Sequence, residues 1–505
     1  MRLKAFTVLA HDGRGTGRGR QQEDLPGHGL ERLQYRRKVV HTVWLSLASF
    51  VCGWVVGQRG PSILELARAA DLTVRRSSTL FALGAGGYLM GCLASGVTFG
   101  RFHKLMSLFW SAIGLGATTI VLPLCSSYEV LAALYCFNFV FVGWLESGSC
   151  ADVARLWGLL GIRVLQVLQL AYITGGAVSP VVSMIFLVDG SREDGVIDRN
   201  EEALSWNYSV DDVRQAHSNS HEPIEQLLRR PLSENVTVRN SLTSLGTHRV
   251  HYAYVISALL CLVAAAPFLV SYITREKQRP STHRPREQEM TPEQSRSRPL
   301  QTVILTLTGI YFFLVSAVEE TVHQFLFLYL VQEVGWSSHR AVLATSLYWL
   351  SMGVVRLLDL FLPQALLKIL LVLATSCSAC ALGGLHASVV MGSEAGVWSC
   401  VVLVGVSNSF IFPGSFSWLD SAVLRVSGSV ALVIMLAGSV AGMVNPLVLG
   451  PLLQEYTYAW FVYLLTSEVT LSLPVLLVMY RIASISPVNR LQQGSQIEKI
   501  TEEEV

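Results

Sequence analysis

Residues 130–150 read VLAALYCFNFVFVGWLESGSC, and this stretch decides the fold class. Val130 to Val142 contains no charged side chain, and the run continues to the ~20 residues that a helix needs to cross a bilayer. Glu146 therefore falls at membrane depth, where a carboxylate costs about 3 kcal/mol on insertion scales. An acid at such a position is by default a candidate for a functional site.

The composition of the whole chain indicates that it is built from such segments. Of its 505 residues, 51% are hydrophobic and 15% are charged, against roughly 25% charged in soluble domains. Twelve apolar runs occur, at 39–58, 77–99, 104–124, 130–150, 164–187, 252–274, 301–330, 341–361, 366–386, 395–418, 429–452 and 457–480. Each must be a helix, because lipid offers no partner to backbone polar groups. We predict an all-α membrane protein with twelve transmembrane helices in two six-helix halves.

Polar segments divide this predicted chain. The parts are a disordered cytoplasmic arm (1–37), an N-terminal half (38–274) with an extracellular loop (188–250), a cytoplasmic linker (275–300), a C-terminal half (301–480) and a cytoplasmic tail (481–505). Asn207 and Asn235 lie in Asn-x-Ser/Thr sequons of the extracellular loop and are predicted glycosylation sites.

The orientation rests on basic residues in short loops. Arg36–Lys38 precedes the first run and Arg101–Lys104 follows the second, which marks the cytoplasmic side and places both termini there. Arg59–Arg76 carries four Arg and is nevertheless assigned to an outer loop. The even helix count and the basic linker both indicate that the opposite side of the membrane is cytoplasmic. We expect a multi-pass protein of the plasma membrane.

An internal repeat supports two related halves. Residues 170–182 read LAYITGGAVSPVV and residues 436–448 read LAGSVAGMVNPLV, and the two align without a gap. Both lie in predicted helices that contain Gly and are kinked by Pro. Paired helices of this kind are typical of transporters built from repeats. Generic packing of small residues is the alternative. Separately, Gly87, Gly91 and Ser95 form a face of small residues on the second run, which predicts a close helix contact.

Few ionisable residues lie within the predicted helices. We interpret Glu146 and Glu319 as coupling or solute-binding acids, with a structural ion pair or hydrogen bond as the alternative for each. Glu320 is interpreted as solvated, and Glu468 as part of a structural pair. Arg356 and Asp359 are spaced to pair on one helix face and predict a structural lock.

Aromatic residues accompany these acids. Flat rings beside carboxylates suit a sugar, whereas Trp and Tyr at helix ends are often interfacial anchors or packing residues. The aromatic residues in question are Trp144, Tyr348, Trp349, Phe412 and Trp418. The sequence contains no phosphate-binding loop, metal cluster or nucleophile triad, so it does not indicate an enzyme. Any transport would then be driven by gradients rather than by ATP.

The chain resembles the sodium-dependent glucose transporter-like branch of the major facilitator superfamily, which is related to the fucose permeases. The resemblance covers most of residues 40–480. Its motifs are Gly60-Pro61-Ser62, Glu65-Leu66, Gly143-Trp144-Leu145-Glu146-Ser147-Gly148, Leu156-Trp157-Gly158, Leu165-Gln166-Val167-Leu168, Ser179-Pro180, Ser346-Leu347-Tyr348-Trp349, Arg356-Leu357, Phe412-Pro413 and Trp418.

The resemblance implies an alternating-access carrier with a sugar or similar solute bound between its halves. Glu146 matches the coupling acid of related permeases, and Glu319 resembles the acid of helix seven. Polar residues in or beside the repeat join the candidate site, namely Gln166, Gln169 and Asn445. The chain departs from the family at Cys150, where Asn is usual, because a thiol cannot replace an amide.

The sequence thus predicts a secondary transporter of a small polar organic solute, with a sugar as the expected class. A non-transporting receptor or scaffold on a degenerate carrier fold is the alternative. The expected partners are the solute and the lipid bilayer; the net charge of +2 favours no nucleic acid. The sequence indicates no cofactor beyond a coupling Na⁺ or H⁺, and no oligomeric state.

Overall fold

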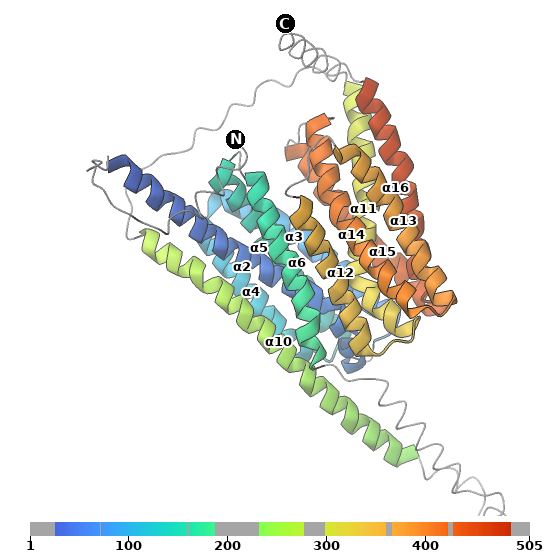
Figure 1. The fold of residues 1–505 in the computed structure, drawn as a ribbon. Helices are drawn as coiled ribbons and strands as arrows, with labels where there is room; N and C mark the ends of the chain where they lie inside the picture. Colours follow the sequence, from blue (N-terminus) through green and yellow to red (C-terminus); the bar gives the residue numbers. More distant parts are fainter. Residues whose placement is uncertain are drawn as a thin grey trace, which may run out of the picture. The chain divides into compact units, whose positions relative to one another are not determined.

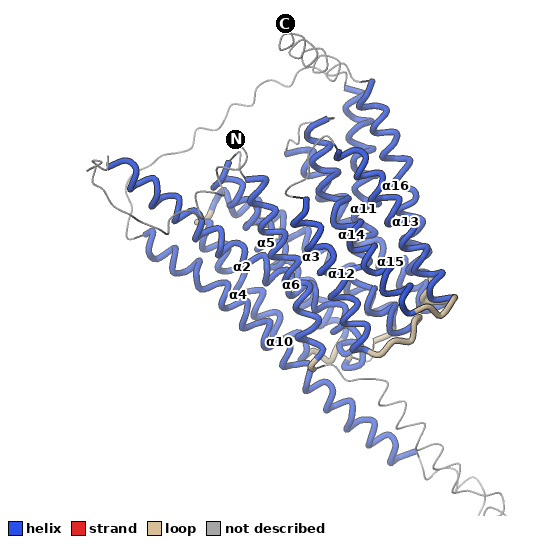
Figure 2. Tube along the Cα trace, in the orientation of Figure 1, coloured by secondary structure: helices blue, strands red, loops and turns tan. Residues whose placement is uncertain are grey.

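The computed structural model describes residues 26–70, 72–158, 161–186, 232–276, 298–359, 366–422 and 428–485. Figures 1 and 2 show these residues as helices joined by turns. The N-terminal half contains α2 (Pro26–Ala69), α3 (Val74–Arg101), α4 (Lys104–Val121), α5 (Tyr128–Trp157), α6 (Gly161–Met184) and α10 (Leu232–Glu276). The C-terminal half contains α11 (Arg298–Gln332), α12 (Ser338–Asp359), α13 (Leu367–Val390), α14 (Glu394–Ala422), α15 (Gly428–Glu455) and α16 (Trp460–Ile485).

Twelve of the described helices are long and apolar enough to cross a membrane, which confirms the predicted fold class. Their apolar length follows from the sequence runs, and their ends follow from local chemistry. α5, for example, ends where Gly158 adopts a positive φ of 52°, a conformation that Gly enters at little steric cost. The chain divides into two compact units, Met1–Val43 and Trp44–Val505, and the second contains the helix bundle with its core and candidate site.

The first helix corrects the predicted boundary at residue 58. α2 begins at Pro26, inside the segment expected to be a disordered arm, and continues to Ala69, through much of the segment expected to be an outer loop. The polar residues beyond residue 58 are accommodated within the helix. Glu65, for instance, accepts a hydrogen bond from Arg68 at 2.8 Å, one turn further on.

The sixth predicted helix also begins earlier than expected. α10 starts at Leu232, whereas the apolar run starts at residue 252. Asn235 therefore lies in the first turns of a helix, where the structure describes the backbone alone, and Asn207 lies outside the described residues. A hydropathy pattern locates the segment that crosses the lipid, but a helix can extend beyond it into water.

Small residues bring α3 and α5 into close contact. A Cβ atom at Gly87 or Gly91 would collide with backbone of α5, and one at Gly143 would collide with the carbonyl of Tyr88. This confirms the predicted small-residue face and is the usual way in which membrane helices approach each other. The consequence is that side chains of α3 and α5 can meet directly.

Among the described helices, the most extensive contacts between the halves are those of α3 with α15 and of α6 with α12. We call the end of the bundle where α2 leads to α3 the α2/α3 end, and the opposite end the α3/α4 end. At the α2/α3 end, the backbone N–H of Arg75 donates to Gln454 Oε1 at 3.1 Å. The rings of Phe81 and Phe325, also from different halves, lie 5.1 Å apart.

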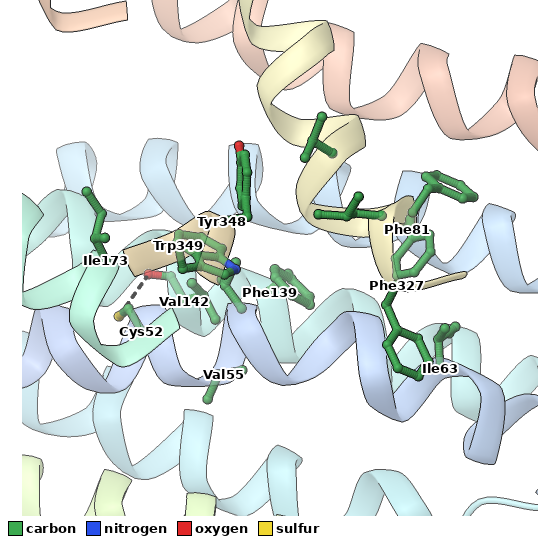
Figure 3. Packing of buried hydrophobic residues seen from close by; sticks show 14 of the residues in the cluster. Cys52, Val55, Ile63, Phe81, Phe139, Val142, Ile173, Phe327, Tyr348 and Trp349 are labelled. Carbon is green, nitrogen blue, oxygen red and sulfur yellow. Dashed lines mark hydrogen bonds between the residues drawn. The ribbon is translucent and has the colours of Figure 1, made fainter. Parts of the chain in front are cut away.

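The hydrophobic core also differs between the two ends of the bundle. One cluster contains residues of both halves, and Figure 3 shows part of it, including Phe81 of α3 and Phe327 of α11. A second cluster belongs to the C-terminal half alone and includes Ile304, Leu371 and Leu419, near the α3/α4 end. Shared packing therefore closes the two halves together at the α2/α3 end.

Candidate functional site

Glu146 is held by the close contact of α3 and α5. Its Oε2 atom accepts a hydrogen bond from the hydroxyl of Tyr88 at 3.2 Å. Gly143, one turn earlier on α5, leaves no room for a Cβ against the Tyr88 backbone, so the two helices are near enough for this bond. The half-buried carboxyl thus has a single phenolic donor, with Arg59 and Glu320 within electrostatic range.

Arg59 brings a positive charge to the same region from α2. The side chain is buried, and its Nε donates to the carbonyl of Val56 at 3.3 Å. Its guanidinium lies 4.5 Å from the centre of the Phe139 ring, a cation–π distance. A terminal nitrogen lies 3.9 Å from Oε2 of Glu320 on α11, so this ion pair crosses between the halves.

His323 and Trp349 form an aromatic wall on the C-terminal side. Their rings stack with centroids 4.1 Å apart and an interplanar angle of 11°. Figure 3 shows Trp349 and the neighbouring Tyr348, both from α12. Among the described residues, neither ring nitrogen of the buried His323 has a hydrogen-bond partner. Unpaired buried polar atoms are uncommon and often mark a site for water or ligand.

Trp349 also reaches the N-terminal half. A Cβ at Gly176 of α6 would lie 2.8 Å from the indole, so Gly is the residue that lets the ring fit. The ring of Tyr172, one turn earlier, lies 6.2 Å from that of Trp349. We define the central cluster as the residues that meet here from several helices of both halves: Arg59, Tyr88, Glu146, Tyr172, Glu320, His323 and Trp349.

Three thiols of the N-terminal half lie within electrostatic range of Glu146: Cys52, Cys92 and Cys150. Cys52 Sγ lies 3.9 Å from the carbonyl oxygen of Val142, as the dashed line in Figure 3 marks. Within the described ranges, no three His, Cys, Asp or Glu side chains are arranged as a metal-ligand set. The chemistry available is therefore hydrogen bonding, ring stacking and transfer of charge or protons.

The structure separates some residues that the sequence grouped together. Phe412 packs on Phe312, with ring centroids 5.3 Å apart, inside the core of the C-terminal half. Trp418 packs on Tyr480 in that core, at 4.5 Å. Their interpretation as solute-binding rings is therefore replaced by a packing role. Trp144 points to α4 and donates to Ser107 Oγ at 2.9 Å.

The remaining candidates lie on α6, α11 and α12, and none forms the hydrogen bond that holds Glu146. Gln166 and Gln169 are half-buried on α6, and Gln166 Oε1 has no partner among the described residues. Glu319 lies within electrostatic range of buried Arg356 on α12, rather than of Glu146. The backbone of Asp359 ends α12, but its side chain is not among those described, so the predicted lock stays a prediction.

Sequence reasoning missed Arg59 and Tyr88. Arg59 follows a long apolar run, and such a charge is ordinarily read as the start of a loop. Glu320 was interpreted as solvated, yet its partly exposed carboxylate meets Arg59. The sequence signal that Glu320 could belong to the site was its spacing of three residues from His323, which places both on one face of α11.

The comparisons with known proteins agree with this architecture. A family model described as the Major Facilitator Superfamily matches residues 241–446. The human sodium-dependent glucose transporter 1 is 22% identical over 454 residues, which cover 88% of this chain and 79% of the relative. The zebrafish (Danio rerio) protein of the same name is 25% identical, covering 86% and 68%.

In sequence and fold the chain is similar to the major facilitator superfamily. Within it, the relatives support the predicted sodium-dependent glucose transporter-like branch. Solved structures of the superfamily's fold are similar along most of the chain. A variant of the nucleoside transporter NupG aligns with a TM-score of 0.58 at 10% identity, over 87% of this chain and 99% of that one.

A second structure is the xylose transporter XylE from E. coli in a partially occluded inward open conformation. It aligns with a TM-score of 0.58 at 11% identity, over 87% of this chain and 96% of that one. Together the family match and the relatives identify a secondary transporter rather than an enzyme. They do not favour the alternative of a non-transporting scaffold.

Proposed function

We propose that this protein carries a sugar-like solute between its two halves, at the central cluster. The observation that carries the proposal is the ion pair between Arg59 and Glu320, which joins the halves within electrostatic range of Glu146. The partly exposed ring of Tyr172 offers a face to the C–H side of a sugar, and Trp349 with His323 backs the site as a buried wall. The names of the relatives favour a hexose, although Cys150 differs from the amide usual in that branch.

The conformation supports alternating access. If the linker end is cytoplasmic, as the basic loops indicate, then the α2/α3 end faces outward. Packing between the halves at that end corresponds to an outward-closed carrier whose solute would leave toward the cytoplasm. The plasma membrane and glycans at Asn207 and Asn235 are part of this proposal.

Glu146 is the proposed coupling residue. It is half-buried, with Tyr88 as its hydrogen-bond donor, so occupancy by a proton or a cation changes the charge of the cluster. In the charged state it attracts Arg59, in competition with Glu320. Binding of H⁺ or Na⁺ would release Arg59 to Glu320 and thereby favour contact between the halves.

Reconstituted protein tests the proposal. A panel of labelled hexoses, pentoses and nucleosides should include one solute with saturable uptake into proteoliposomes. Glu146→Gln should abolish uptake driven by an ion gradient while leaving solute exchange intact. Glu129→Gln, on the exposed first turn of the same helix, serves as the control. The coupling role fails if Glu146→Gln retains full gradient-driven uptake, and the transporter itself fails if no solute is carried.

A further inference from the structure

We propose that α11, α15 and α16 form a binding site for a monovalent cation of the sodium class, with Glu468 as the charged ligand. The site lies within the C-terminal half and is separate from Glu146. Binding itself does not depend on the proposed transport function; only the role of the cation in coupling rests on it.

The oxygen atoms are already gathered around one point. Asn445 Nδ2 lies 2.9 Å from Thr321 Oγ1, 3.1 Å from Glu468 Oε2 and 3.4 Å from the carbonyl oxygen of Ala317. An amide nitrogen has two protons, so it can form linear hydrogen bonds to only two of these three acceptors at once. Rotation of the Asn445 amide by half a turn presents Oδ1 instead, and four oxygens from three helices then face one another. A cation is what such a group of oxygens can share.

The charge of the site matches a monovalent ion. Glu468 is 8% exposed and Asn445 is 2% exposed. Within the described part of the chain, Asn445 is the hydrogen-bond partner of Glu468, and the ion pairs formed there involve other carboxylates. A buried carboxylate without a counter-charge is costly. One Na⁺ neutralises it, whereas a divalent ion would leave a net positive charge in the same low-dielectric position.

The chemistry of the donors also favours a hard cation. Carboxylate, hydroxyl, amide and backbone carbonyl oxygens bind such ions well, whereas the thiols beside Glu146 do not. Gln324 lies one turn from Thr321 on α11 and is 1% exposed. Both polar atoms of its side chain lack a partner among the described residues, so its amide oxygen is available as a further ligand.

The site is connected to the central cluster through adjacent residues of α11. Thr321 belongs to the proposed cation site, and Glu320 forms the ion pair with Arg59 across the halves. Any shift of α11 that adjusts Thr321 to a bound cation also moves Glu320. Cation binding can therefore be coupled to contact between the halves, provided that the protein transports as proposed.

Thermal unfolding of the purified full-length protein tests binding directly. Melting curves are recorded in NaCl and in choline chloride at equal ionic strength, with NaCl titrated against choline. Na⁺ should raise the melting temperature saturably, because a ligand that binds the folded state stabilises it. Glu468→Gln keeps a hydrogen-bonding group and should raise the half-saturating Na⁺ concentration about tenfold or more.

Two further variants locate the effect. Glu333→Gln, a carboxylate just beyond the end of α11, should retain the Na⁺ response. Thr321→Val removes one oxygen at nearly constant shape and decides the question if Glu468→Gln does not fold. An absent Na⁺ response in the unmodified protein, or an unchanged response in Glu468→Gln or Thr321→Val, would overturn the proposal.

Solute flux is measured in the same preparations, so that the two proposals can fail separately. A Na⁺ response that depends on Glu468, without flux of any solute, supports the cation site and contradicts the transport proposal. Saturable flux without a Na⁺ response contradicts the cation site and leaves the transport proposal in place.

Discussion

Helices α6 and α15 carry the two copies of the internal repeat, yet they have developed different surroundings. Gly176 of α6 and Gly442 of α15 are aligned, and each faces a helix of the opposite half. A Cβ at Gly176 would lie 2.8 Å from the Trp349 ring, whereas one at Gly442 would lie 3.2 Å from the Cβ of Ala85. In both copies the shared Gly thus lets the helix pack closely on a helix of the opposite half.

The next aligned pair differs. Ser179 of α6 is fully buried, and its hydroxyl has no partner among the described residues. Asn445 of α15 contacts Thr321 and Glu468. One copy therefore keeps the repeat as a packing element, and the other adds a buried polar group. The difference teaches that the repeat fixes how the halves meet, while single side chains within it fix where polar chemistry can occur.

The largest effect is expected when Asn445 is replaced by Ala, in contrast to the same replacement at the aligned Ser179. Asn445→Ala leaves Glu468 and Thr321 without their amide partner, and should lower the free energy of unfolding by about 3 kcal/mol. Ser179→Ala removes an unpaired hydroxyl and should change it by less than about 0.5 kcal/mol. Denaturant unfolding in detergent measures both, and equal losses would contradict the asymmetry.

A smaller effect is expected from adding a methyl group at the aligned Gly residues. Gly176→Ala must displace a large buried indole and should cost about 2 kcal/mol, with slower transport, since overpacking costs are of this order. Gly442→Ala should cost less than about 1 kcal/mol, because the contact with Ala85 is looser. Melting temperatures of the two variants decide the order, and a greater loss at Gly442 would refute it.

The smallest effect is expected where both copies face outward. Val178 and Val444 are aligned, and both side chains are exposed on the helix bundle. Replacement of either by Leu should change stability by less than about 0.5 kcal/mol, because neither packs in the core. The measurement is again the melting temperature in detergent. A large loss at one position alone would reveal a contact specific to that copy.

Apolar length and small-residue spacing allowed the twelve helices and a close helix contact on α3 to be predicted, but not that α5 is the partner. Both features depend on residues close in sequence. A membrane helix forms its backbone hydrogen bonds within itself, and a face of Gly residues permits close approach wherever it occurs. The same reasoning fails at boundaries. α2 passes through residues 59–69 because Arg59 meets the ring of Phe139 on another helix, which the local pattern does not show, and because Glu65 pairs with Arg68 one turn on.

The sequence by itself determined the class of the protein and its two related halves, and it singled out Glu146 as a candidate. Only the tertiary structure decided which residues accompany that acid: it brought in Arg59, Tyr88 and His323, and placed Phe412 and Trp418 in a separate core. It also joined Asn445 to Glu468 on a different helix. The physical reason is that burial of a segment follows from its own composition, whereas the partner of a buried side chain follows from how helices rotate and cross.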